Sequence, residues 1–224
     1  KNKKLKIISF SEKNKNANVV FLNQKKIKKK YLITLNINHK IKSFVISKEL
    51  LNYKQNILAS LSIIINYFTI EKLNENLFLN FHIPKSRGSI INHRTGSKKL
   101  TIVDESYNSN PLSFKFALKK FDETYSENQR KFLLIGNMLE LGKYSKKLHI
   151  KIAKYINKSK VNKAYTYGKL TKHTFNKLKP QMRGKMLIKD MDILNLINKD
   201  LPNNSFLMIK GSNSTGLNKI IQNL

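Results

Sequence analysis

The sequence contains no cysteine. The chain can therefore form neither a disulfide framework nor a cysteine-based zinc site or nucleophile. It also lacks the roughly 18 consecutive apolar residues of a membrane span, because two serines and an asparagine interrupt its longest apolar stretch, residues 58–68. The basic, apolar and small-residue segments that mark a signal peptide are missing as well. We therefore expect a cytoplasmic protein without a membrane span.

Acidic residues are scarce, with 13 Asp and Glu against 44 Lys and Arg, for a formal net charge of +31. Such a charge favours an anionic partner, nucleic acid included. Only four basic residues are arginine, whose planar fork reads phosphates and guanines: Arg87, Arg94, Arg130 and Arg183. The abundance of Lys, Asn and Ile is typical of an A/T-biased coding sequence. We therefore favour a solvated lysine-rich surface and no nucleic-acid partner, and a role of the charge in holding anionic nucleotides stays open.

The first part of the chain carries β-branched and aromatic residues in short segments separated by Lys- and Asn-rich turns. This pattern predicts strands at 5–10, 18–22, 31–37 and 40–46, with residues 24–30 as a solvated hairpin turn. Apolar residues at helical spacing then predict a helix over 49–68, followed by a short second helix from a Thr69 cap to residue 78. Pro84 breaks the pattern, so we predict two domains, 1–84 and 85–224.

From residue 86 onward, strand and helix patterns alternate. Strands are predicted at 89–93, 100–103, 131–136, 163–168 and 205–210, and helices at 111–121, 143–158, 170–178, 191–198 and 216–224. Asn110 can cap the first of these helices, and Pro111 suits its first position because a proline there loses no hydrogen bond. The alternation predicts an α/β fold, a Rossmann-like domain with a mainly parallel sheet.

Three polar loops, 104–111, 136–142 and 210–214, follow predicted strands of this sheet. Ligands of open α/β sheets bind beyond the C-terminal ends of strands, so these loops are candidate binding segments. The first offers two carboxylates, an aromatic ring and amides, although a polar turn with an Asn cap is an equal interpretation. The third places a glycine between a strand and a helix N-terminus, an arrangement suited to anions.

The residues of these loops resemble signatures of the Mur ligases, the ATP-dependent amide-forming enzymes of peptidoglycan synthesis. Asp-Glu-Ser-Tyr-Asn-Ser-Asn-Pro at 104–111 is similar to the segment that opens their C-terminal domain, and its Tyr-Asn-x-Asn-Pro form is similar to the member that adds D-alanyl-D-alanine. Residues 136–142, with the downstream His149, resemble a Gly-Asp-Met-x-Glu-Leu-Gly loop, and 210–214 resemble a Lys-Gly-Ser-x-Ser segment. The motifs occur in the family's order, which makes them stronger together than apart.

This chain departs from the family pattern at four positions. Ser86 replaces the first glycine of a Gly-Arg pair, and Asn137 replaces the usual Asp. In residues 52–59, which resemble the family's adenine-holding segment, Asn52 stands for His and Tyr53 for Asn. His149 shares a helix face with apolar residues, so a packed core histidine is the alternative to a role in fixing the loop.

The resemblance implies an ATP-dependent ligase that joins D-alanyl-D-alanine to UDP-N-acetylmuramoyl tripeptide through an acyl phosphate, with Mg²⁺ as a further cofactor. It implies that 1–84 is the tail of the central ATP-binding α/β domain and 85–224 the C-terminal domain, of a monomer. The implied nucleotide contacts are Arg87, Asp104, Glu105, Asn52, Tyr53 and Asn56. The implied substrate contacts are Tyr107, Asn108, Asn110, Asn137, Glu140, His149, Lys210, Ser212 and Ser214.

The phosphate cradle Gly-x-x-x-x-Gly-Lys-Ser/Thr does not occur in the 224 residues. We therefore expect the chain to be the C-terminal half of such an enzyme, without metal ligands and inactive alone. Three alternatives stay open. The first is another Mur-type ligase, such as folylpolyglutamate synthase or the diaminopimelate-adding enzyme, whose Asp-Asn-Pro-Arg signature is not found here. The second is a basic nucleic-acid-binding module, and the third is a catalytically silent remnant.

Overall fold

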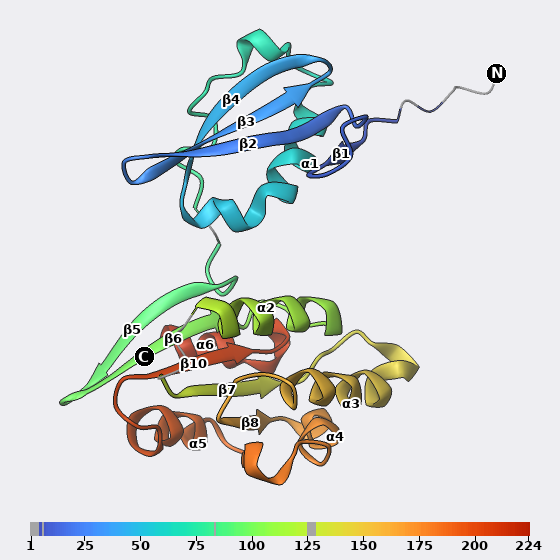
Figure 1. Ribbon diagram of the computed structural model, residues 1–224. Helices are drawn as coiled ribbons and strands as arrows, with labels where there is room; N and C mark the ends of the chain where they lie inside the picture. The colour runs from blue at the N-terminus through green and yellow to red at the C-terminus, as the bar shows by residue number, and fades with distance from the viewer. Residues whose placement is uncertain (1–4, 6, 83, 125–128) are drawn as a thin grey trace. The chain divides into compact units, whose positions relative to one another are not determined.

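A computed structural model describes residues 5, 7–82, 84–124 and 129–224. The chain divides into two compact units, Lys1–Ile83 and Pro84–Leu224, so the division lies beside Pro84. Each unit has a hydrophobic core of its own, made of residues from that unit alone. Each unit is therefore described by itself (Figure 1).

Unit 1 is a four-stranded sheet covered by one helix. The strands β1 (Phe10–Ser11), β2 (Val19–Ile27), β3 (Lys30–Ile37) and β4 (Lys40–Ser47) lie in that order. β1 runs parallel to β2, and the other neighbours are antiparallel. A 3₁₀ turn, Glu49–Tyr53, leads into α1 (Lys54–Ile64), whose apolar side packs on the sheet because Ile57, Leu58 and Leu61 recur at helical spacing.

The structure corrects four expectations for unit 1. The proposed turn at 24–30 is wrong, because β2 continues to Ile27 and only two residues separate it from β3. The helix expected over 49–68 starts as a 3₁₀ turn and ends at Ile64. The second short helix is a single 3₁₀ turn, Ile70–Lys72, and Thr69 makes no side-chain cap. Of the described residues in 5–10, only Phe10 belongs to a strand.

Unit 2 is built on a six-stranded sheet in the order β5-β6-β10-β7-β8-β9. Its strands are β5 (Ser89–Thr95), β6 (Lys98–Glu105), β7 (Lys131–Gly136), β8 (Lys163–Tyr167), β9 (Arg183–Leu187) and β10 (Ser205–Lys210). Only β5 is antiparallel to its neighbour. The predicted α/β fold with a mainly parallel sheet is confirmed.

Helices cover both faces of this sheet (Figure 1). The α-helices are α2 (Pro111–Thr124), α3 (Ser145–Ile156), α4 (Lys172–Phe175), α5 (Asp190–Asn195) and α6 (Leu217–Gln222), and a π-helical turn, Leu196–Asp200, extends α5. Shorter 3₁₀ turns are Gly142–Tyr144, Lys169–Thr171, Pro180–Met182 and Asn213–Thr215.

The central strand β7 shows why both faces must be covered. Its residues are buried throughout. Phe132 and Leu134 pack with residues of α5 and α6, whereas Leu133 and Ile135 pack with residues of α2 and α3. Because side chains alternate along a strand, a continuously apolar strand needs an apolar layer on each side.

Candidate active site

Three polar loops meet at one edge of the unit 2 sheet. Lys210, the last residue of β10, is in register with Glu105 at the end of β6 and with Ile135 near the end of β7. Because the three strands are parallel neighbours, the loops that follow them, 104–111, 210–214 and 136–142, lie side by side. We call this edge the β6–β10–β7 rim.

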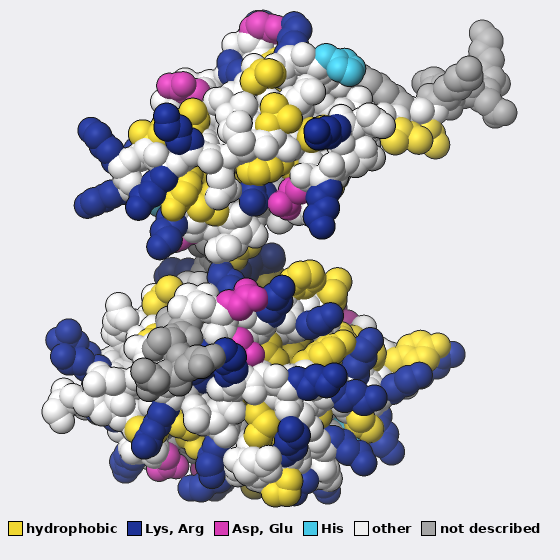
Figure 2. Space-filling model, in the orientation of Figure 1, with side chains coloured by type: hydrophobic (Ala, Val, Ile, Leu, Met, Phe, Trp, Pro, Cys, Tyr) yellow, Lys and Arg dark blue, Asp and Glu magenta, His cyan; other side chains and the backbone are white. Residues whose placement is uncertain are grey.

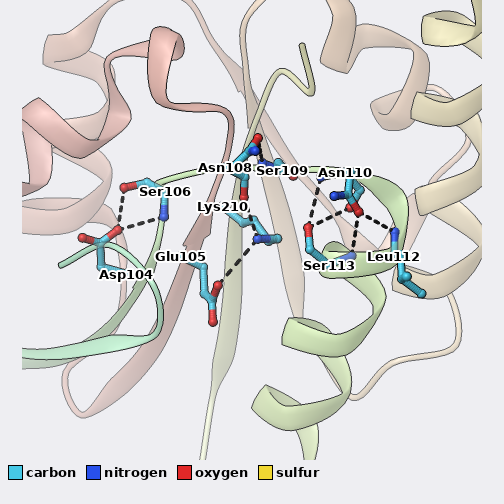
Figure 3. A network of polar contacts seen from close by, with 9 residues as sticks. All are labelled: Asp104, Glu105, Ser106, Asn108, Ser109, Asn110, Leu112, Ser113 and Lys210. Atoms are coloured by element: carbon cyan, nitrogen blue, oxygen red, sulfur yellow. Dashed lines mark hydrogen bonds and ion pairs between the residues drawn. The ribbon is translucent and has the colours of Figure 1, made fainter. Parts of the chain in front are cut away.

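A buried ion pair joins the first two loops. The Lys210 ammonium lies 3.6 Å from Glu105 Oε2 and donates a 2.9 Å hydrogen bond to the carbonyl oxygen of Asn108 (Figure 3). The Lys210 side chain is 3% exposed and that of Glu105 19%. Burial lowers the pKa of Lys210, and the neighbouring Glu105 carboxylate opposes that shift. Lys210 therefore anchors the 104–111 loop to the end of β10, and the Glu105 side chain remains partly exposed to solvent.

Asp104, the other carboxylate of the loop, is enclosed by hydrogen bonds. Its Oδ2 accepts from Ser86 Oγ at 2.8 Å, and its Oδ1 accepts from the amide and hydroxyl of Ser106 at 3.0 and 2.5 Å. Asp104 is 3% exposed and belongs to β6 rather than to the loop expected from the sequence. Its carboxylate thus fixes the strand end, and the nucleotide contact expected of it would need these bonds to rearrange.

Ser86 adopts a backbone conformation that favours glycine, with φ of +62°. This is the position where the sequence has lost the first glycine of the Gly-Arg pair. The Ser86 hydroxyl compensates through its bond to Asp104, and the Ser86 carbonyl accepts from the Tyr107 amide at 3.0 Å. The segment before β5 is thereby tied to the 104–111 loop.

Arg87 and Tyr107, which follow Ser86 and Ser106 in the sequence, stack on each other. The guanidinium carbon of Arg87 lies 4.0 Å from the centre of the Tyr107 ring. Both residues are exposed. The exposed guanidinium of Arg87 carries a positive charge, which suits it to an anionic ligand.

Asn110 caps α2, as the sequence predicts. Its Oδ1 accepts from the amides of Leu112 and Ser113 at 3.0 and 2.8 Å, and Ser113 Oγ accepts from the Asn110 amide at 3.1 Å (Figure 3). The amide oxygen of Asn108 is also engaged, by the Ser109 amide at 2.7 Å. Hydrogen bonds within the loop therefore occupy both of these side-chain oxygens.

The second and third loops are bonded to each other. The Ser212 amide donates to the Asn137 carbonyl and the Leu139 amide to Ser212 Oγ, each at 2.9 Å. Asn137 Oδ1 accepts from the Leu170 amide at 3.0 Å, which joins the loop after β8 to the rim. A Cβ on Gly136 would lie 2.6 Å from Leu217 Cδ1 and 3.2 Å from the Gly211 Cα. A side chain at position 136 would therefore have to displace Leu217 and would crowd the backbone where β10 ends.

His149 fixes the start of the 136–142 loop from inside α3. Its Nδ1 bonds to the carbonyl oxygen of Ser145 at 2.9 Å, so Nδ1 carries the proton and Nε2 accepts from the Met138 amide at 3.1 Å. The ring is completely buried, and burial lowers its pKa below the ordinary value. His149 is thus both a core residue and a support for the loop.

Most of unit 2 matches a known protein family. A match to the family described as "Mur ligase, glutamate ligase domain" covers residues 90–213, more than half of the chain. The chain belongs to the Mur ligase family. This match includes the three strands of the β6–β10–β7 rim and its loops up to residue 213.

The relatives of this chain include curated enzymes of one name. The UDP-N-acetylmuramoyl-tripeptide–D-alanyl-D-alanine ligase of Rickettsia prowazekii is 30% identical over 139 residues, 62% of this chain and 30% of the relative. The enzyme of that name from Bacillus subtilis is 28% identical over 133 residues, 56% of this chain and 28% of the relative. The matched segment of the chain thus covers less than a third of the length of these relatives.

Solved structures show the same fold. A MurF structure from Acinetobacter baumannii gives a TM-score of 0.71 at 17% identity and covers 97% of this chain and 46% of its own. MurF of Thermotoga maritima, solved in complex with ADP, gives 0.67 at 16% identity and covers 95% of this chain and 47% of its own. The chain therefore corresponds to somewhat less than half of these ligases.

The remaining expected residues are not among those named in the hydrogen bonds above. Glu140 and Ser214 are exposed on their loops, and Glu140 has a φ of +61°. Asn52, Tyr53 and Asn56 belong to unit 1, where Asn52 and Asn56 are exposed at the start of α1 and Tyr53 is half-buried. Within the described residues, no group of three or more His, Asp or Glu side chains could hold a metal ion. No helix in the described part of the chain is long and apolar enough to cross a membrane.

Sequence reasoning missed several residues that shape this edge. Ser86 and Ser106 hold Asp104, and the lost glycine at 86 was the available signal. The Tyr167 hydroxyl donates to Asp190 at 2.6 Å, which raises its pKa to about 12. No sequence motif predicted the contact between Tyr167 and Asp190, because β8 and the start of α5 are separated in the sequence.

Proposed function

We propose that this chain is the C-terminal part of an ATP-dependent ligase that adds D-alanyl-D-alanine to UDP-N-acetylmuramoyl tripeptide, a step of peptidoglycan precursor synthesis. The observation that carries the proposal is the β6–β10–β7 rim, where three segments with Mur ligase signatures share one hydrogen-bonded edge. The names of the curated relatives support the choice of the D-alanyl-D-alanine-adding member. The setting proposed for this reaction is the cytoplasm.

The proposed division of labour follows from which side chains keep a face toward solvent. Arg87, stacked on Tyr107, offers a guanidinium for nucleotide phosphates, and Glu105 offers a carboxylate oxygen for ribose hydroxyls. These groups suit the nucleotide, and ATP supplies the phosphoryl group that activates the tripeptide carboxylate. Unit 1, with Asn52, Tyr53 and Asn56, is proposed as the end of the ATP-binding domain, whose remainder would hold the phosphates and Mg²⁺.

The enclosed side chains act as positioning residues in this proposal. Lys210, Asp104 and His149 are buried and bonded to backbone or neighbouring groups, so they set the shape of the loops rather than contact the incoming dipeptide. The side chains left to line the dipeptide site are those of Tyr107, Glu140 and Ser214. Rigid loops matter because amide formation depends on holding an amine against an activated carboxylate.

The test measures phosphate release from ATP with UDP-N-acetylmuramoyl tripeptide and one amine at a time. The proteins are this chain alone and this chain joined behind the N-terminal region of the Rickettsia prowazekii ligase that it does not match. We expect no turnover by the chain alone and release by the joined protein with D-alanyl-D-alanine only. An Arg87→Ala change should raise KM for ATP about tenfold, the effect of losing one charge-assisted phosphate contact of about 1.4 kcal/mol.

The other outcomes separate the alternatives. Release with diaminopimelate or glutamate in place of the dipeptide would identify another Mur-type ligase. Turnover by the chain alone would contradict the assignment of the phosphate site to a different region. Lys219→Ala serves as the control for Arg87→Ala, because Lys219 is an exposed cation of unit 2 on α6, outside the rim loops.

A further inference from the structure

The strongest concentration of charge outside the rim is the tip of the β2–β3 hairpin in unit 1. Five lysines stand within six residues there: Lys25, Lys26, Lys28, Lys29 and Lys30. Lys25 and Lys26 lie near the end of β2, Lys28 and Lys29 form the two-residue turn, and Lys30 begins β3. Figure 2 shows Lys and Arg side chains projecting around this end of unit 1. We call residues 25–30 the basic tip.

The basic tip has no compensating negative charge. Between Glu12 and Glu49 the sequence contains no Asp or Glu. In the described part of the chain, no carboxylate forms an ion pair with any of the five lysines, whereas Lys54, on α1, pairs with Glu12 at 3.8 Å. Five like charges in one hairpin repel one another, so the tip gains from an anionic surface that neutralises them.

The backbone of the turn adds a second observation. Lys28 has a φ of +53°, a conformation that Asn and Gly adopt at less cost. The next hairpin of the same sheet has Asn38 at the corresponding place, with a φ of +47°. A/T-rich codons produce Asn as readily as Lys, so coding bias alone does not account for a strained lysine at 28.

The composition of the tip distinguishes between anionic partners. It contains neither arginine nor an aromatic side chain, the groups that read phosphates and stack on bases in nucleic-acid sites. It does contain Ile27, which is 41% exposed among the lysines. Lysines around an exposed apolar side chain are the pattern that binds anionic lipid headgroups while the apolar group enters the interface.

We propose that the basic tip, residues 25–30 with Ile27 at its centre, docks this protein on an anionic phospholipid surface. The contact is peripheral and reversible, and it is electrostatic with a small apolar contribution. It is independent of the ligase chemistry, because none of the five lysines belongs to the rim loops.

The test is sedimentation of the full chain with phosphatidylcholine vesicles, with and without phosphatidylglycerol, at low and high salt. The variant Lys28→Asn/Lys29→Asn removes two charges and relieves the strain at 28, so it should fold. The control Lys151→Gln/Lys158→Gln removes two charges from exposed positions in and just after α3. At about fivefold per lysine near an anionic surface, the tip variant should bind roughly 25-fold more weakly, and the control should stay within about twofold of the original chain.

Ile27→Ser should also weaken binding severalfold, with Ile41→Ser, at a 71% exposed position, as its control. Three results would overturn the proposal. Equal losses in the tip variant and the lysine control would indicate unspecific charge. Unchanged binding of Ile27→Ser would remove the apolar contact. Duplex DNA that binds the tip more tightly than the vesicles and displaces them would identify nucleic acid as the partner.

Discussion

The ion pair between Glu105 and Lys210 offers the sharpest test of how the rim is held. Glu105→Gln keeps the size of the side chain and removes its charge, which leaves the buried Lys210 ammonium without this counter-charge, beside neutral oxygens such as the Asn108 carbonyl. Removing one member of a buried pair costs about 3–5 kcal/mol. Because Glu105 is 19% exposed and 3.6 Å away, we expect a loss smaller than that range, about 2 kcal/mol of unit 2 stability.

A pair of similar length on the surface supplies the control. Lys185 and Asp200 are 3.5 Å apart, with side chains 73% and 43% exposed. Asp200→Asn should change stability by less than about 1 kcal/mol, because solvent screens the interaction. The two variants differ mainly in burial, so the difference between them measures what burial contributes.

The cost of Glu105→Gln should depend on pH. Burial lowers the pKa of Lys210, so the unfolded chain binds more protons than the folded one between the folded and unfolded values, and stability rises with pH in that window. Losing the Glu105 carboxylate lowers the pKa of Lys210 in the folded variant further. In the variant, the pH range in which stability rises therefore begins at a lower pH. The deficit of the variant should therefore shrink as the solution becomes alkaline.

The assay is unfolding in urea, monitored by hydrogen exchange of the backbone amides in β6 and β10. Because both strands belong to unit 2, the signal reports on unit 2 separately from unit 1. Lys210→Met and the double variant complete a thermodynamic cycle. We expect a coupling energy above about 1 kcal/mol between the two positions. Additive effects, or a deficit that grows with pH, would refute the conclusion that a buried charge pair joins these strands.

Three further predictions concern single positions in unit 2, each measured by unfolding. Ser86→Gly and Ser86→Ala both lose the hydrogen bond to Asp104, but only glycine relieves the positive φ, so the alanine variant should be less stable by about 1 kcal/mol; the reverse order would contradict the strain argument. Stability should fall as pH drops below 6.5, because unfolding lets the buried His149 take up a proton. His149→Gln should reduce this pH dependence of stability. An unchanged profile in the variant would show that other groups cause the dependence. Gly136→Ala should cost about 2 kcal/mol through its clash with Leu217, and Leu217→Ala should recover part of that loss in the double variant; no recovery would show that the backbone contact dominates.

Strands with strong apolar character were predictable from the sequence, and exposed ones were not. β7 and β10 are continuously apolar, so their positions and their two-sided burial followed from the pattern. β9, Arg183–Leu187, was missed because an edge strand needs little apolar surface and this one contains Arg, Gly and Lys. The lysine-rich residues 24–27 resembled a turn but extend β2, because backbone pairing with β3 outweighs their weak strand propensity.

The order of strands also required the structure. β10 is the last strand in the sequence and lies between β6 and β7, the first two of the parallel set. Local patterns contain no information on this insertion. It brings residues 105, 135 and 210 into register and so creates the shared rim.

The candidate site was predictable as a set of loops and not as a network. Asn110 as a helix cap followed from local chemistry. The enclosure of Asp104 depends on Ser86, 18 residues earlier, and the burial of Lys210 depends on a loop 102 residues earlier. Contacts of that range follow from the fold, so the role of Asp104 and Lys210 in anchoring the 104–111 loop required the structure.

The central claim is that the β6–β10–β7 rim receives the substrates of a ligase. Hydrogen exchange of the joined protein, with and without ADP and D-alanyl-D-alanine, tests it most directly. We predict slower exchange in residues 104–111, 136–142 and 210–214 together, with no change in the basic tip at 25–30. Protection at other edges of the sheet, with these three loops unchanged, would contradict the account.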